Sequence, residues 1–168
     1  MDFRDFRRCF FMKLSDALSA NRVKLNLSSK NKTEVIEELI DTAVNANSIV
    51  DRCEFRNKVF EREKLKSTAL SDGIAIPHAQ SDSVKGICVC LGISRTGIEF
   101  DSLDGKPAHI ILLIAAQEHL DAPYLSLLSR IVRIFSKAHI RQKVITAKSS
   151  QDIIHIIEDV EKLLTTVR

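Results

Sequence analysis

The segment Ser67–Ala79 reads Ser-Thr-Ala-Leu-Ser-Asp-Gly-Ile-Ala-Ile-Pro-His-Ala and places one histidine directly after a proline. Gly73 permits the backbone angles of a tight turn, and Pro77 fixes its own φ and keeps the residue before it extended. His78 is therefore presented at a defined angle. With an ordinary pKa of about 6.5, a neutral imidazole keeps a free lone pair near neutrality and can act as a nucleophile or general base. The alternative is a structural histidine that caps a turn.

Groups that bind oxyanions precede this histidine. Arg62 and Glu63 end a predicted helix, and Ser67 and Thr68 lie between that helix and the histidine. A guanidinium offers a planar pair of donors to phosphate oxygens, and hydroxyl and backbone N–H groups satisfy the remaining lone pairs. Such donors also stabilise the charge that develops during phosphoryl transfer. The residue types therefore favour phosphoryl chemistry at His78, with Arg62, Ser67 and Thr68 as the donors.

The same residues resemble the signature of a known family, the enzyme IIA domains of the fructose, mannitol and nitrogen-regulatory class. These domains belong to the bacterial phosphoenolpyruvate-dependent sugar phosphotransferase system. The residues that carry the resemblance are Arg62-Glu63, Ser67-Thr68, Gly73 and Ile74-Ala75-Ile76-Pro77-His78-Ala79. Weaker similarity, in Leu27-x-Ser-Lys30 and in the stretch Leu125–Ser129, extends it from about Leu14 to Leu164.

The resemblance implies a mechanism and partners. His78 would accept a phosphoryl group from a phosphohistidine carrier resembling HPr or its nitrogen-system counterpart. The group would then pass to a IIB domain, or its presence would be sensed by a regulatory target protein. Positioning and charge stabilisation are the protein's main tasks in such a transfer, so no cofactor and no metal are expected.

Members of this family commonly carry a second site histidine in a His-Leu-x-x-Leu pattern at the start of a late helix, and this chain departs from that pattern. Alignment on Leu125 and Leu128 places Tyr124 at the position. His119 falls five residues earlier. A phenol can donate one hydrogen bond but cannot become a cation, and His119 would have to reach the site from a loop. Either residue could assist His78, or neither.

The departure at Tyr124 keeps a second class of function open, a regulatory binding module in which phosphorylation is vestigial. Within the enzyme IIA family, the chain resembles the free-standing nitrogen-regulatory type, since it shows no IIC region and no IIB or HPr-like domain. A sugar-specific component is the alternative. A nucleotide-binding domain is disfavoured, because the chain has neither a G-x-G-x-x-G turn nor a Walker-type loop.

Composition limits the other possibilities. A chain of 168 residues with 45% hydrophobic content predicts one domain with a sizeable core. The 25 basic and 22 acidic residues are interspersed, and one Tyr with no Trp offers few stacking platforms, so nucleic-acid binding is not expected. No apolar run approaches the roughly 20 residues that a membrane-spanning helix needs, so no membrane insertion is expected. Residues 1–13 are interpreted as an N-terminal extension to a domain of residues 14–168.

The cysteines show no CxxC spacing and no paired framework; they are Cys9, Cys53, Cys88 and Cys90. Reduced, packed thiols are therefore expected, and with them a cytoplasmic protein. Because residues two apart in a strand share a face, the last two thiols should point to the same side of a sheet.

Helical periodicity predicts the elements before the motif. A helix over 30–45 follows Ser29 as its N-cap. The pair Asp51 and Glu54 forms an acidic variant of a capping box, with Val50 placed for a hydrophobic staple, and opens a helix that carries the arginine to the site.

Three apolar runs predict strands that are covered on both faces: 74–76, 86–93 and 108–116. A turn at Asp104-Gly105 separates the last two. Three helical stretches close the chain: 123–137, 139–147 and 150–164. Helices before, between and after the strands imply an α/β protein, a three-layer α/β/α sandwich with a mixed central sheet.

Overall fold

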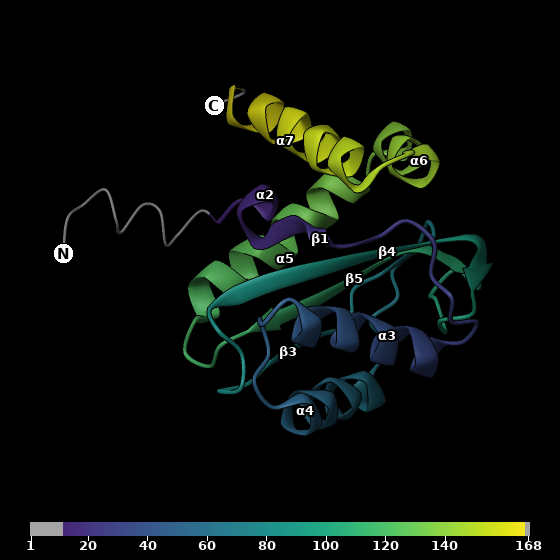
Figure 1. The fold of residues 1–168 in the computed structure, drawn as a ribbon. Coiled ribbons are helices and arrows are strands. Elements are labelled where there is room, and N and C mark those ends of the chain that lie inside the picture. The colour runs from purple at the N-terminus through teal and green to yellow at the C-terminus, as the bar shows by residue number, and fades with distance from the viewer. Residues whose placement is uncertain (1–11, 167–168) are drawn as a thin grey trace, which may run out of the picture.

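The computed structural model describes residues 12–166, so the predicted extension of residues 1–13 lies almost wholly outside the described part of the chain. The helices are α2 (Leu14–Ala17), α3 (Lys32–Asn45), α4 (Arg52–Leu65), α5 (Asp121–Phe135), α6 (Ala138–Thr146) and α7 (Ser150–Thr166). The strands are β1 (Leu18–Lys24), β2 (Ile74–Ala75), β3 (His78–Gln80), β4 (Ile87–Ile98) and β5 (Ala108–Ala116). Helices α3 and α4 cover one face of the sheet and α5, α6 and α7 cover the other (Figure 1). The predicted three-layer α/β/α sandwich is confirmed.

The sheet is mixed. Strand β4 pairs with β1 in parallel and with β5 in antiparallel fashion. The free edge of β5 is taken by two short parallel strands, β2 opposite Ile110 and Ile111, and β3 opposite Ile114–Ala116. Pro77 lies between these two strands, where its missing N–H removes no ladder bond and its carbonyl accepts from the N–H of Ile114 at 2.9 Å.

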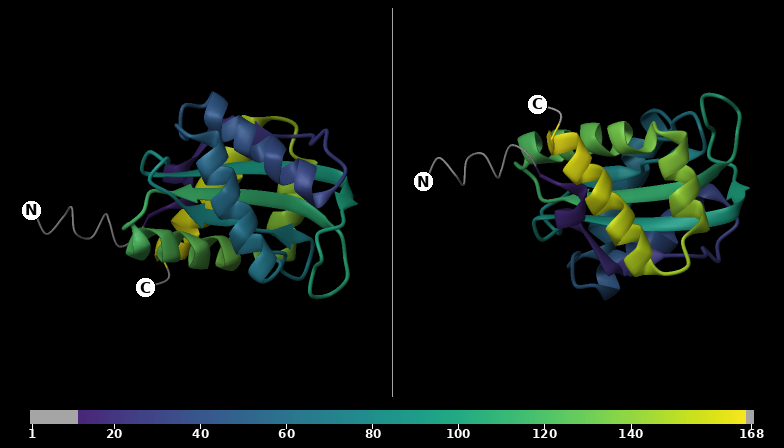
Figure 2. Two further views of the ribbon diagram at one scale, coloured as in Figure 1. Left: turned by 90° about the horizontal axis from the view of Figure 1, so that it is seen from below. Right: turned by 90° about the horizontal axis from the view of Figure 1, so that it is seen from above.

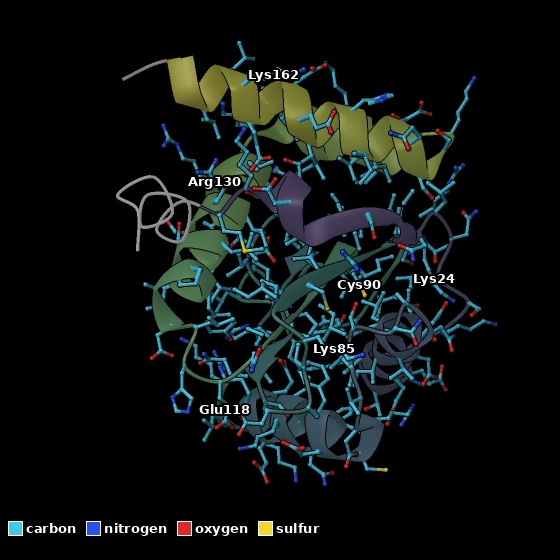
Figure 3. All side chains as sticks on the ribbon, turned by 60° about the vertical axis from the view of Figure 1, so that its left-hand side comes forward. Lys24, Lys85, Cys90, Glu118, Arg130 and Lys162 are labelled. Carbon is cyan, nitrogen blue, oxygen red and sulfur yellow. The ribbon has the colours of Figure 1, made fainter. Side chains whose placement is uncertain are left out.

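Successive side chains of β4 point to opposite faces of the sheet, so the core has two halves, one on each face. Val89 and Leu91 pack under α5, α6 and α7, whereas Cys88 and Cys90 pack against α3 and α4. Figure 2 shows the two helical layers from opposite sides, and Cys90 lies inside the molecule in Figure 3. The two buried thiols are free and share a face, as predicted. A sheet buried on both faces explains why these strands are nearly continuous apolar runs.

The start of α3 differs from the prediction. Asn31, not Ser29, is the N-cap, and its side chain accepts from the N–H of Glu34 at 3.0 Å. The Ser29 hydroxyl instead donates to Glu38 at 2.5 Å. An Asn side chain reaches the same N-terminal N–H groups as a Ser side chain, so the residue types alone could not choose between the two positions.

The start of α4 confirms half of the prediction. Asp51 is the N-cap and accepts from the N–H of Glu54 at 3.0 Å. The Glu54 carboxylate does not return to the N-cap; it accepts from the Ser81 hydroxyl at 2.7 Å. Val50 is 70% exposed, so the predicted hydrophobic staple is wrong.

Two strands escaped the sequence analysis. β1 pairs irregularly with β4, and most of its side chains are not buried, so it lacks the apolar run of a covered strand. β3 is three residues long. The turn at Gly105 is confirmed, with a φ of +67°. Within residues 12–166, no helix combines the length and the apolar character required to cross a membrane.

Candidate functional site

His78 is the first residue of β3, at the point where the chain leaves Pro77 and rejoins the edge of β5. Its imidazole is half-buried, and Nδ1 lies 2.6 Å from the carbonyl oxygen of Ile76. A carbonyl oxygen can only accept, so Nδ1 must carry the hydrogen in this bond. In the neutral ring, Nε2 therefore holds the free lone pair. The turn that precedes the strand uses Gly73 at a φ of +79°, as the sequence predicted.

The surroundings of His78 favour its neutral form. Burial lowers the pKa of the imidazole, and the charge of Arg62 lowers it further. The hydrogen bond to Ile76 and the charge of Glu63 act in the opposite direction, but the net shift is downward from the ordinary 6.5. At neutral pH the ring is therefore uncharged, with its lone pair available on Nε2.

Arg62 lies in the last turn of α4, and its Nη1 donates to the carbonyl of Lys66 at 3.0 Å. Its charge acts on two rings, the imidazole of His78 and the phenol of Tyr124, whose pKa values it lowers. A fixed cation is thus held beside the histidine by the end of a helix. The remaining N–H groups of a guanidinium are free to bind an anion there.

Tyr124 lies in the first turn of α5 and is buried, with its ring centroid 6.1 Å from that of His78 and the planes tilted by 58°. Burial raises the pKa of the phenol to about 12, although Arg62 opposes the shift. The hydroxyl therefore stays protonated at neutral pH. Among residues 12–166 this hydroxyl has no protein hydrogen bond, so it is available as a donor on a ring that lies next to the imidazole.

His119 is placed differently. It is exposed, has a φ of +68°, and lies in the loop between β5 and α5. It lines a hollow with Gln80, Glu118 and Asp121. Of the two candidates for the second site residue, the structure brings Tyr124 into contact range of His78 and leaves His119 at the surface.

Ser67 and Thr68 are close to the site, but their hydroxyl hydrogens point to protein acceptors. Ser67 donates to the carbonyl of Phe100 at 2.7 Å. Thr68 donates to Glu63 at 2.6 Å and is buried. In this arrangement both hydroxyls hold the loop after α4 rather than facing the imidazole.

Two charged residues of this region were given no role at the site from the sequence, although Glu63 was named in the Arg62-Glu63 motif. Glu63 is buried and forms an ion pair of 2.8 Å with Lys32, the first residue of α3. Burial would raise the pKa of Glu63, but hydrogen bonds from Lys32 and Thr68 outweigh burial and keep it below 4.5. Lys32 also pairs with Asp101 at 3.0 Å. Glu63 could have been suspected from its place beside Arg62, whereas the partner on α3 carries no sequence signal.

Most of the chain matches the model of a known protein family. The family model described as "Phosphoenolpyruvate-dependent sugar phosphotransferase system, EIIA 2" matches residues 16–160. The chain belongs to this family. The resemblance found in the motif around His78 is thereby confirmed for nearly the whole EIIA chain.

Named relatives of this EIIA protein include both sugar-specific and regulatory members. It is 36% identical over 151 residues to the fructose-specific EIIABC component of Bacillus subtilis, covering 90% of this chain and 24% of that protein. It is 32% identical over 138 residues to the fructose-specific EIIA component of Haloferax volcanii, covering 82% of this chain and 90% of that protein. The crystal structure of nitrogen regulatory protein IIA-Ntr from Neisseria meningitidis matches this fold with a TM-score of 0.80 at 28% sequence identity. The match covers 86% of this chain and 98% of that chain.

Proposed function

We propose that this EIIA protein is a phosphoryl carrier that accepts a phosphoryl group on Nε2 of His78 from a phosphohistidine carrier of the HPr type. The observation that carries the proposal is the 2.6 Å contact between Nδ1 and the carbonyl of Ile76, which leaves the lone pair on Nε2. That lone pair forms the new P–N bond as the donor's P–N bond breaks, and the electron pair returns to the donor nitrogen. No proton has to move, so a neutral imidazole at neutral pH is sufficient.

Arg62 and Tyr124 complete this step. The guanidinium neutralises part of the charge on the transferring group, and the phenol offers it one hydrogen bond. Both groups are fixed before the donor arrives, since one ends a helix and the other is buried in the first turn of another. Ser67 and Thr68 support the loop after α4, so their contribution to the step is indirect.

Intact mass spectrometry tests the proposal. The purified chain is incubated with enzyme I, the HPr-type carrier and phosphoenolpyruvate, and we expect a mass gain of one phosphoryl group. His78→Ala should abolish the gain. His109→Ala is the matched control, since His109 is also half-buried and its Nδ1 also bonds to a backbone carbonyl, that of Ser94 at 2.9 Å. No gain in the wild-type chain, or a gain that survives loss of His78, would reject the carrier function.

Two roles remain for the phosphorylated form. The free-standing nitrogen-regulatory role expected from the sequence would pass a signal to a regulatory target protein, and the match to IIA-Ntr supports it. A sugar-specific role would pass the group to a IIB domain, and the 36% and 32% identities to fructose-specific proteins favour it. Loss of the label when the phosphorylated protein meets a fructose-type IIB domain would select the sugar-specific role. Retention of the label would select the regulatory one.

A regulatory binding module with vestigial phosphorylation is distinguished from a phosphoryl carrier by whether partner binding depends on phosphorylation. Binding of a regulatory partner that ignores both the phosphorylation state and an acidic replacement of His78 would favour that module. Binding that follows phosphorylation would favour the carrier, because the modification adds about −1.5 to −2 charge to this surface.

A further inference from the structure

We propose that Glu63 is a positioning residue that fixes both the tautomer of His78 and the place of Arg62, through the loop of residues 66–68. The inference rests on the proposed carrier function. Glu63 is not expected to touch the phosphoryl group, because its carboxylate is buried and already has protein partners on both oxygens.

The carboxylate of Glu63 holds Thr68 at two atoms. Oε1 accepts from the backbone N–H of Thr68 at 3.0 Å, and Oε2 accepts from the Thr68 hydroxyl at 2.6 Å. A carboxylate that bonds both the main chain and the side chain of one residue restricts its position and its orientation. Charge-assisted bonds of this kind are stronger than neutral ones. The loop after α4 is therefore fixed at Thr68.

From Thr68, two further hydrogen bonds lead to the imidazole. The carbonyl of Thr68 accepts from the N–H of Ile76 at 3.1 Å. The carbonyl of Ile76 in turn accepts from Nδ1 of His78 at 2.6 Å. The position of the acceptor that sets the tautomer thus depends on the residue that Glu63 holds. If the Ile76 carbonyl moved away, Nδ1 would lose its acceptor and the two neutral tautomers would compete.

The same loop places the guanidinium. Arg62 donates to the carbonyl of Lys66, which is two residues before Thr68. The intervening Ser67 is itself tied to the carbonyl of Phe100 at 2.7 Å. Movement of the loop would therefore shift the arginine as well as the imidazole. A displacement of about 1 Å is enough to cost a large factor in rate when transfer depends on alignment.

Lys32 completes the arrangement on the outer side of Glu63. Its ammonium lies 2.8 Å from the carboxylate and 3.0 Å from Asp101, with the ring of Phe100 centred 5.2 Å away. The pair joins the start of α3 to the end of α4. A buried carboxylate without such a partner would be costly to keep ionised, so the lysine allows Glu63 to remain a double acceptor.

Glu38 supplies a matched control. Its carboxylate accepts from the N–H of Ser29 at 3.0 Å, from the Ser29 hydroxyl at 2.5 Å and from Lys24 at 3.1 Å. The contacts of Glu38 and Glu63 are thus of the same kinds, but the loop that Glu38 holds does not lead to His78. Glu118 lines a hollow with Gln80 of β3, the strand that begins with His78. In Figure 3, Lys24, the ion-pair partner of Glu38, lies on the opposite side of the view from Glu118.

The experiment compares Glu63→Gln with Glu38→Gln by two measurements. The first is the ¹⁵N chemical shifts of the His78 ring in the unphosphorylated protein, which report the tautomer. The second is the rate of phosphoryl uptake as a function of the concentration of the phosphorylated HPr-type carrier. For Glu63→Gln we expect a mixture of tautomers and a kcat about ten- to a hundredfold lower, with KM for the carrier little changed. Glu38→Gln should match the wild-type chain in both.

A folded Glu63→Gln protein with the wild-type tautomer would overturn the proposal, whatever its rate. If that variant does not fold, Thr68→Val decides, since it removes one of the two bonds to Glu63 and nearly preserves the volume. A shift of the ring tautomer in the same direction would support the proposal, and an unchanged tautomer would reject it. The tautomer measurement needs no phosphoryl donor, so failure of the wild-type chain to accept phosphate would count against the carrier function alone.

Discussion

Glu38 on α3 and Glu63 on α4 each pair with a lysine and accept from a hydroxyl and from backbone N–H groups, two of them at Glu38 and one at Glu63. Around Glu38 the held segment precedes α3, beside a hollow that Ser29 and Glu38 help to line. Around Glu63 the held segment is hydrogen-bonded onward to Ile76, whose carbonyl accepts from the imidazole of His78. The local chemistry is the same in both regions. We call such a carboxylate, with its lysine and its hydrogen-bond donors, a polar clamp. A polar clamp therefore gains a functional role only from the chain segment that it holds in place.

Burial also differs between the two regions. The side chains of Lys32 and Glu63 are 22% and 6% exposed, whereas those of Lys24 and Glu38 are 39% and 10% exposed. Loss of the carboxylate would leave Lys32 with less access to water than Lys24. The clamp near His78 is consequently the more costly one to break.

The largest expected effect is therefore on stability. Glu63→Ala should lower the free energy of unfolding by about 3 kcal/mol, because it leaves two buried donors of Thr68 without their acceptor and removes one of the two ion-pair partners of Lys32. Glu38→Ala should cost less, because Lys24 keeps more access to water than Lys32 does. Urea denaturation measures both values, provided that the free energy of unfolding depends on urea concentration with the same slope in each variant and in the wild-type chain. Equal losses in the two variants would contradict the difference between the regions.

A smaller effect is expected on the rate of phosphoryl uptake when the phenol beside His78 loses its hydroxyl. Tyr124→Phe should slow uptake about tenfold, since it removes one hydrogen bond to a charged group and keeps the buried ring. His119→Ala should leave the rate unchanged, because that side chain lies at the surface. The tautomer of His78 should be unaffected in both, in contrast to Glu63→Gln. A rate loss in His119→Ala with none in Tyr124→Phe would reverse the assignment.

The smallest effect concerns acid stability. Burial opposes ionisation of Glu38, but the bonds from Ser29 and Lys24 lower its pKa from 4.5 to about 2. A carboxylate whose pKa is lower in the folded state than in the unfolded state stabilises the fold at pH values above the unfolded-state pKa. This contribution is lost as the pH falls from about 5 to about 2. Glu38→Gln should therefore flatten the fall in stability over this range. Stability measured by urea denaturation at several pH values tests this, and an unchanged slope would show that the bonds do not favour the ionised form.

The turn that precedes His78 could be predicted from the local sequence. A left-handed Gly73, an extended Ile76 and a Pro77 without an N–H are short-range requirements, so the turn could be predicted from residue types. The apolar runs of β4 and β5 were equally clear, since a strand covered on both faces needs apolar side chains throughout. The edge strand β1 was missed because an edge needs little apolar surface. The cytoplasmic location and the boundary at residue 14 stay predictions.

The choice of N-cap for α3 shows why the remaining details were out of reach. Ser29 and Asn31 are both good N-cap residues, and only the position of Glu38, nearly two turns into the helix, decides which of them turns toward it. Such a decision depends on side chains that meet after folding. Propensity alone cannot rank two residues of similar preference.

The sequence by itself determined that one imidazole of an α/β protein would be presented at a defined angle after Pro77, because backbone sterics and hydrophobic pattern act over a few residues. Tertiary structure alone decided that Tyr124 rather than His119 lies beside that imidazole, and that Lys32 pairs with Glu63. Both decisions join segments more than thirty residues apart, and only the packing of α3, α4 and α5 around the sheet brings them together.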